Sequence, residues 1–346
     1  MGCSQGNVGA MIEAHYVESS NGLLFAVKGL VHPPDAVVAY LRYAPDPEGE
    51  RNRGETRYRR FYHFKQQEEL LRKECPACLF WDPVFGAWLQ GVPKDRIRLV
   101  YDPSWKLAEL RRSEFLDELE ERVVEFAALI SERGGVPESS VGVSGSVLVG
   151  LHSPASDVDL VVYGTQHCRV IHTALQELLD EPTSEVRRLD DGEMRALYTS
   201  RSQDTPMSFQ HFAALEGRKV NQGSFRGDEY FIRFVQAPAE IGEDYGDRKY
   251  TALGQATIEA TVVDADKAMF TPCSYKVEDV RLMGPQLSLP LPVEVTSFRG
   301  RFCEQAREGE RIFAKGKLER VVARGGDISY RLLLGGPGDY MTVDWG

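Results

Sequence analysis

Two aspartates one residue apart at the start of an apolar run constrain this chain more than any other feature. The run is VDLVVY (158–163), with Asp157 directly before it and Asp159 inside it. Side chains of a strand alternate between its faces, so both carboxylates project to the same side, with Cα atoms about 6.5 Å apart. Like charges this close repel each other and raise each other's pKa. A divalent cation shared by the two carboxylates removes that cost, so we expect a metal site here.

A glycine–serine bend precedes the aspartates. VGV (141–143) predicts a short strand, and Gly145 and Ser146 follow it, ten residues (147–156) before Asp157. Glycine allows a phosphate to approach the backbone closely, the serine hydroxyl adds a donor, and N–H groups at the start of a following helix attract anions. Magnesium is typically bound by one or two carboxylates together with substrate phosphates. The pattern therefore predicts a phosphate cradle beside a Mg²⁺ (or Mn²⁺) site.

This motif resembles the signature of the nucleotidyltransferase superfamily typified by DNA polymerase β. The signature is an apolar residue, Gly, Gly or Ser, a spacer, and then Asp, an apolar residue, Asp or Glu, and an apolar residue. Here it reads Val-Ser-Gly-Ser (143–146) and Asp-Val-Asp-Leu (157–160). The arrangement is also similar to that of uncharacterised archaeal proteins called predicted nucleotidyltransferases. The resemblance covers 141–164 strongly and 104–240 loosely.

The resemblance implies an enzyme that moves a nucleotidyl group from a nucleoside triphosphate to an acceptor hydroxyl and releases pyrophosphate. Asp157 and Asp159 would be catalytic metal ligands, and Gly145 and Ser146 would bind the phosphates. The acceptor is open: a nucleic-acid end, a protein side chain or a small molecule.

The family usually carries a third carboxylate on a later strand. FIRFV (231–235) resembles that strand, but Phe231 stands where the aspartate is expected. Glu229, two residues earlier and on the same strand face, is the candidate that completes the catalytic and metal-binding set. If no third carboxylate is present, a non-catalytic nucleotide- or nucleic-acid-binding module is the alternative. A scaffold that binds a protein partner is a third interpretation.

Changes in sequence style indicate a multidomain α+β protein. We expect a flexible tail (1–10), a small mixed β-rich domain (11–103), a small mixed α/β nucleotidyltransferase-like domain (104–240) and an all-β, barrel-like domain similar to an OB-fold (250–346). Apolar residues at steps of three and four predict one helix that Ser104 caps and that ends at Gly134-Gly135.

Basic residues supply further candidate binding groups. Net charge is −11, so nucleic acid is repelled except at a local basic patch. The candidate patches are 51–60, where aromatic residues interleave with arginines, and 299–324, for which a salt-bridged β surface is an equal alternative. Arg218 and Lys219 are candidates to bind the triphosphate, and ordinary loop charges are the alternative for both.

The six scattered cysteines are not a secreted disulfide framework, and no apolar run approaches the roughly 20 residues that cross a bilayer. We therefore expect a cytoplasmic protein without a membrane-spanning segment. Cys75 and Cys78 form a lone CxxC with too few ligands for zinc. Two partly buried thiols are the favoured interpretation, and a local disulfide is the alternative. Cys168 and His172 share one face of a predicted helix, where packing is favoured over metal binding.

Overall fold

The computed structural model describes residues 11–201, 207–284 and 288–345, so the expected tail (1–10) lies outside it. The fold is mixed α+β with three sheets. The chain divides into two compact units, and each is built from segments that are distant in sequence. The first unit contains the described residues up to Asp82 together with Ala87–Ala174 and Tyr230–Tyr245, and the second contains Pro83–Gly86, Leu175–Glu229 and the chain from Gly246 onward. The expected boundary at 103/104 falls inside the first unit, within a helix.

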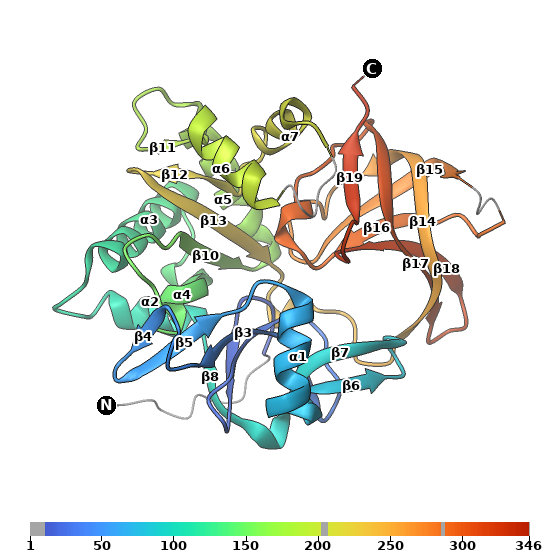
Figure 1. Cartoon of the computed structure of the whole chain (residues 1–346). Coiled ribbons are helices and arrows are strands. Elements are labelled where there is room, and N and C mark those ends of the chain that lie inside the picture. The colour runs from blue at the N-terminus through green and yellow to red at the C-terminus, as the bar shows by residue number, and fades with distance from the viewer. Residues whose placement is uncertain (1–10, 202–206, 285–287, 346) are drawn as a thin grey trace. The chain divides into compact units, whose positions relative to one another are not determined.

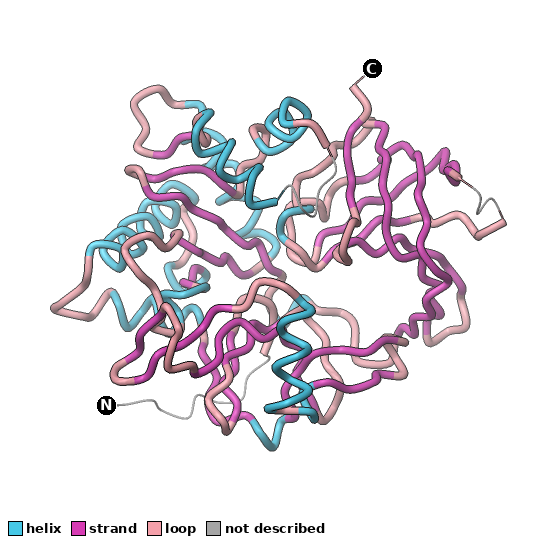
Figure 2. The backbone as a smooth tube through the Cα atoms, in the orientation of Figure 1, coloured by secondary structure: helices cyan, strands magenta, loops and turns pink. Residues whose placement is uncertain are grey.

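An antiparallel sheet forms the N-terminal part of the first unit (Figure 1). Its strands are β1 (Tyr16–Ser19), β2 (Leu24–Val27), β3 (Ala36–Pro45), β4 (Arg51–Arg53), β5 (Thr56–Arg60), β6 (Leu79–Asp82), β7 (Ala87–Pro93) and β8 (Ile97–Tyr101). Their order is β4-β5-β3-β2-β1-β8, and β7 pairs with both β3 and β6. The helix α1 (Phe64–Glu74) packs against β3 and β6 and buries Leu71 in the apolar core of this sheet. Figure 2 shows the same helix crossing strands of the sheet.

A second, smaller group of strands in the first unit carries the aspartates. β10 (Val158–Tyr163) pairs antiparallel with β9 (Val141–Val143) and parallel with β13 (Asp228–Val235). Between β9 and β10 lies the short helix α4 (Gly145–Leu148), and α5 (Thr165–Asp180) follows β10. Val158, Leu160 and Val162 are fully buried, so one strand presents a carboxylate while its other side chains pack the core.

The single helix expected from Ser104 to Gly134 is wrong, because two helices occupy this stretch. α2 (Pro103–Leu110) is capped by Asp102, whose carboxylate accepts the N–H groups of Ser104 and Trp105. α3 (Glu118–Gly134) starts anew, since Asp117 and Glu120 form a capping box that satisfies two N–H groups at its first turn. The predicted end is confirmed: Gly135 takes the left-handed conformation that closes the helix.

The second unit contains α6 (Asp191–Arg201), α7 (Phe209–Glu216), the paired strands β11 (Val186–Arg187) and β12 (Gln222–Phe225), and a barrel. The barrel strands are β14 (Arg248–Asp264), β15 (Cys273–Met283), β16 (Glu294–Ser297), β17 (Arg311–Ala323) and β18 (Ile328–Leu334), with β19 (Tyr340–Val343) added beside β17. The path β14-β15-β16-β18-β17 returns to β14, so the sheet is closed around an apolar core. The expected all-β barrel is confirmed, whereas its likeness to an OB-fold stays a prediction.

None of the described helices combines the length and the apolar character that a bilayer span requires.

Candidate functional site

Asp157 and Asp159 stand at the start of β10, as the sequence predicts. Asp157 precedes the strand and is exposed, whereas Asp159 is half-buried and its backbone carbonyl accepts the N–H of Ser144 at 2.8 Å. The pKa of the Asp157 carboxyl is raised, first because surrounding protein displaces part of its water and then because of the negative charge of Asp159. The two carboxylates therefore act on each other electrostatically, which is the repulsion that a shared cation relieves.

Gly145 lies directly against one of these carboxylates. A Cβ atom built on Gly145 would come 2.0 Å from Oδ2 of Asp159, and the residue has a φ of +61°. Only glycine meets both conditions without strain or collision. Ser146 follows within the four-residue α4 and is buried. The structure thus brings the glycine–serine bend and Asp159 together, although they are distant in sequence.

Arginines from two parts of the first unit act on the carboxylates. Nη1 of Arg233, on β13, lies 3.2 Å from Oδ1 of Asp159. The positive charges of Arg60 and Arg51 act to lower the pKa of Asp157 against the two effects that raise it. Arg51 also donates to the hydroxyls of Ser153 and Ser156, at 2.6 and 3.0 Å, in the loop that leads to Asp157.

Sequence reasoning missed these arginines as parts of the aspartate site. The sequence predicts that the patch 51–60 binds nucleic acid. Its proximity to the aspartates arises from tertiary structure, which the local sequence does not encode. Arg233 left a readable signal, because it stands two residues after Phe231 and therefore on the same strand face.

The position of the third carboxylate is set by the register of β10 and β13. These parallel strands pair from Val158 with Tyr230 onward, and Asp159 lies beside Phe231. Glu229 belongs to β13 but stands one residue before the paired stretch. Among the described residues, no group of three His, Cys, Asp or Glu side chains close enough to share a metal includes Asp157 or Asp159. The role of Glu229 stays a prediction.

Arg218 and Lys219 lie in the second unit, where each holds a carboxylate. Arg218 pairs with Glu310 at 2.5 Å, and the side chain of Lys219, 1% exposed, pairs with Glu216 at 2.8 Å. Lys219 also donates to the carbonyl of Arg301 at 2.7 Å. These contacts tie α7 and the barrel together, and binding of a triphosphate by either cation stays a prediction.

Three basic residues of the patch 299–324 form ion pairs with carboxylates. Its ion pairs are Arg311 with Glu259, Lys317 with Glu319 and Arg324 with Asp247. These contacts favour the solvated β surface over a nucleic-acid groove in this part of the chain.

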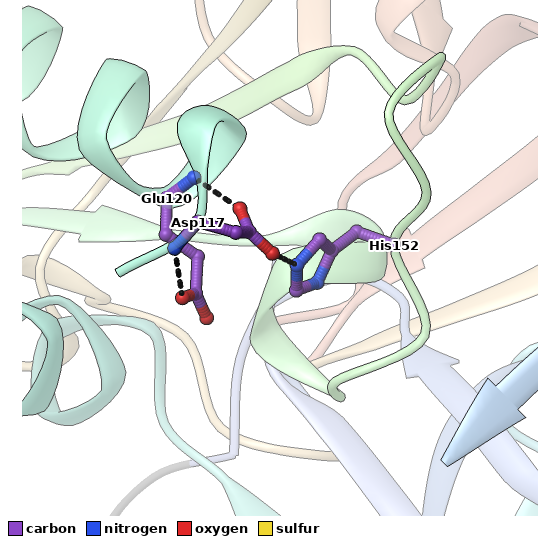
Figure 3. Close-up of side chains that lie close together, drawn as sticks. All are labelled: Asp117, Glu120 and His152. Atoms are coloured by element: carbon purple, nitrogen blue, oxygen red, sulfur yellow. Dashed lines mark hydrogen bonds and ion pairs between the residues drawn. The ribbon is translucent and has the colours of Figure 1, made fainter. Parts of the chain in front are cut away.

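A cluster that sequence reasoning missed lies beside the loop that follows α4 (Figure 3). Asp117, Glu120 and His152 bring their ligand atoms within 4.8 Å of one another. Asp117 accepts the N–H of Glu120 at 2.9 Å and contacts Nε2 of His152 at 2.7 Å, while Glu120 accepts the N–H of Asp117. The ligand atoms are thus used in a helix cap, and the cluster fixes the start of loop 152–157 to α3. The pattern Asp-x-x-Glu was the available signal.

The cysteine alternatives are now decided. The favoured interpretation of Cys75 and Cys78 as two thiols is wrong, because they form the local disulfide that was the alternative, and both are buried. The buried thiol of Cys168 donates to the carbonyl of Val162 at 3.2 Å, and the ring of His172 packs against that of Phe234. Helix packing, the favoured interpretation for Cys168 and His172, is confirmed.

No protein-family model matches the chain. It is 30% identical over 334 residues to Uncharacterized protein MJ1086 of the archaeon Methanocaldococcus jannaschii, and the match covers 92% of this chain and 94% of that protein. The chain belongs to the same family as this archaeal protein. The match extends over nearly the whole of both sequences, so it includes segments of both compact units of this chain.

Proposed function

We propose that this protein is a metal-dependent nucleotidyltransferase that uses a nucleoside triphosphate and transfers its nucleotidyl group to an acceptor hydroxyl. The observation that carries the proposal is the contact of Gly145 with the Asp159 carboxylate, with Asp157 beside it. This contact places a glycine bend, whose backbone a phosphate can approach, next to two interacting carboxylates that can hold a cation. A metal–triphosphate complex needs both.

The donor set suits a hard divalent cation. Asp157 and Asp159 offer carboxylate oxygens, the ligands that Mg²⁺ and Mn²⁺ prefer. Loss of water and then the charge of Asp159 raise the pKa of Asp157, and a cation between the carboxylates would offset both effects. When bound, the metal would neutralise charge on the triphosphate and on the leaving pyrophosphate.

The remaining work falls to side chains of the first unit. Arg60 and Arg51 supply positive charge near Asp157, where the polyphosphate would lie. Arg233 orients the Asp159 carboxylate through their ion pair. The acceptor hydroxyl loses its proton to solvent and attacks the α-phosphorus, the bond from that phosphorus to the oxygen bridging the α- and β-phosphates breaks, and pyrophosphate leaves with this oxygen. Positioning and charge stabilisation provide most of the catalysis.

A second candidate is a nucleotide-binding module without transferase activity. Phe231 lies beside Asp159, where a third carboxylate is expected, and Arg233 already neutralises Asp159. Both features favour a site that binds a triphosphate but lacks the base for transfer.

Transfer of label from triphosphates labelled at the α-phosphate, with Mg²⁺ and a panel of acceptors, separates the two candidates. We expect transfer by the parent protein and a loss of about 100-fold or more in Asp159→Asn. Asp264→Asn is the matched control, because Asp264 is a barrel carboxylate paired with Lys276 at 2.7 Å. Triphosphate binding without transfer by the parent would favour the module.

A further inference from the structure

A pocket of the first unit lies apart from the aspartates, between α1 and the paired strands β6 and β7. Its volume is about 570 Å³, within the range of sites for small organic groups, roughly 300–1,000 Å³. Three aromatic side chains, Tyr40, Phe64 and Trp88, line it, and Trp88 is 72% exposed. Glu68 and Arg72 add a carboxylate and a guanidinium to its wall. Aromatic walls with a few polar groups suit a planar ring that carries hydrogen-bonding groups, such as a nucleobase.

The aromatic lining continues along β3 beyond the pocket. From Ala36 to Ala44, every residue of this strand is buried except Tyr40 and Arg42. Because these two are separated by one residue, they project to the same face of the strand. The Tyr40 ring lies 5.0 Å from that of Phe64, and the Arg42 guanidinium lies 5.7 Å from the ring of Tyr62. Tyr40 and Arg42, two residues apart on β3, therefore contact Phe64 and Tyr62, which are also two residues apart in the chain.

β5, which ends at Arg60, pairs with β4, and Arg51 of β4 donates to Ser153 and Ser156 in the loop before Asp157. The guanidinium of Arg60 lies over the same Tyr62 ring, 4.4 Å from its centroid. The charge of Arg60 also acts on Asp157. The Tyr62 side chain is 58% exposed. In the part of the chain that the structure describes, neither Arg42 nor Arg60 forms an ion pair with a carboxylate, and Nε of Arg60 is buried without a hydrogen-bond partner.

We propose that the acceptor is a single-stranded nucleic acid that lies along this aromatic–arginine track, which consists of Trp88, Phe64, Tyr40, Arg42, Tyr62 and Arg60. One base would occupy the pocket, another would stack on Tyr62, and the phosphates between them would meet Arg42 and Arg60, so that the strand end reaches Asp157 and Asp159. The proposal rests on the proposed function for the role of the strand as acceptor, but the binding itself does not.

The chemistry favours an unpaired strand over other occupants. Bases stack on aromatic side chains only when their faces are exposed, which excludes a duplex. The net charge of −11 opposes binding of a polyanion elsewhere, so the guanidiniums of Arg42 and Arg60, which both lie at the Tyr62 ring, form a local exception.

Fluorescence anisotropy of labelled oligouridine and oligothymidine of about ten nucleotides, measured with EDTA present, tests the track without any transfer chemistry. We expect the parent to bind, and Trp88→Ala and Tyr62→Ala each to weaken binding about tenfold. Arg42→Gln should reduce the salt dependence of binding: the slope of log affinity against log salt concentration should be smaller in magnitude by about one. A preference for one oligomer tells whether the strand is RNA or DNA.

Trp81→Ala is the matched control. Trp81 is 54% exposed, lies across the β6–β7 pair from Trp88 with ring centroids 6.3 Å apart, and is outside the pocket lining. Binding by this variant should equal that of the parent. The track would be overturned by any of three results: the parent does not bind, a duplex binds equally well, or Trp81→Ala and Trp88→Ala weaken binding equally.

The outcomes also separate the track from the proposed function. Oligonucleotide binding that depends on Trp88, without label transfer by the parent, supports the track and removes the transferase. Transfer to small molecules by a protein that binds no oligonucleotide keeps the transferase and removes the track.

Discussion

Gly145 is the residue on which the proposed site depends most. Its lack of a side chain leaves room for the Asp159 carboxylate, and its φ of +61° is one that other residues adopt only with strain. The glycine of the motif thus has a second role besides the phosphate contact that the sequence suggests.

Gly145→Ala should therefore be costlier than a glycine substitution elsewhere in the same loop region. Gly150 is the matched comparison, since its φ is +65° but a Cβ there would meet only Arg53, at 3.8 Å. Both substitutions should cost about 1 kcal/mol of backbone strain, and Gly145→Ala should cost at least about 2 kcal/mol more because β10 or Asp159 must move. Denaturant unfolding of both variants measures this, and equal losses would contradict the packing at Gly145.

Asp157 carries an electrostatic cost that depends on pH. Its folded-state pKa lies above the unfolded value, so ionisation destabilises the fold as pH rises between these two values, and the cost persists at neutral pH. Asp157→Asn removes the charge. We expect this variant to be more stable than the parent near neutral pH, with a difference that vanishes at pH values below the unfolded pKa. Urea unfolding across this range, without metal, measures the difference, and a less stable variant at neutral pH would refute the cost of ionised Asp157.

At the scale of elements, α3 and the loop before β10 are joined through one carboxylate. Asp117 caps α3 and contacts His152, at the start of the loop that ends at Asp157. Partial burial is the largest single effect on the pKa of Asp117 and raises it, but the N–H of Glu120 and the contact with His152 together leave the pKa lowered. Since the folded pKa is depressed, the resulting stability is present above the unfolded pKa and is lost as pH falls through the folded one.

Two substitutions of Asp117 separate the cap from the contact with His152. Asp117→Ala should cost about 1 kcal/mol through loss of the cap, whereas Asp117→Asn keeps a good cap and loses the charge. Asp117→Asn should therefore flatten the acid limb of the stability curve with a smaller loss at neutral pH. Unfolding curves measured against pH distinguish the variants, and equal losses in both would show that the cap contributes nothing.

Local sequence signals predicted these elements correctly only where no capping motif interrupted the apolar spacing. The alternation around Asp159 placed β10 correctly, because one register keeps Val158, Leu160 and Val162 buried. The prediction of one helix failed because Leu116 fits the apolar spacing, although it lies in the loop between α2 and α3. Asp117 and Glu120 cap a new helix directly after it.

At the scale of the molecule, long-range contacts decide what the sequence leaves open. The Gly145–Asp159 contact agrees with the motif spacing, but the approach of Arg60 to Asp157 joins segments almost a hundred residues apart, which no local pattern encodes. Closure of the barrel likewise depends on pairing of β14 with β17. The strand-like spacing predicted the barrel because each strand alternates, and the glycine–serine bend before the two aspartates predicted that Gly145 and Asp159 belong to one site.

Calorimetric titration of the parent and of the double variant Asp157→Asn/Asp159→Asn with Mn²⁺, in the presence of a nucleoside triphosphate, tests the central claim most directly. The parent should bind the metal and triphosphate together, and the double variant should remain folded and lose at least about tenfold in metal affinity. Equal binding by both proteins, or no binding by the parent, would contradict the assignment of this site.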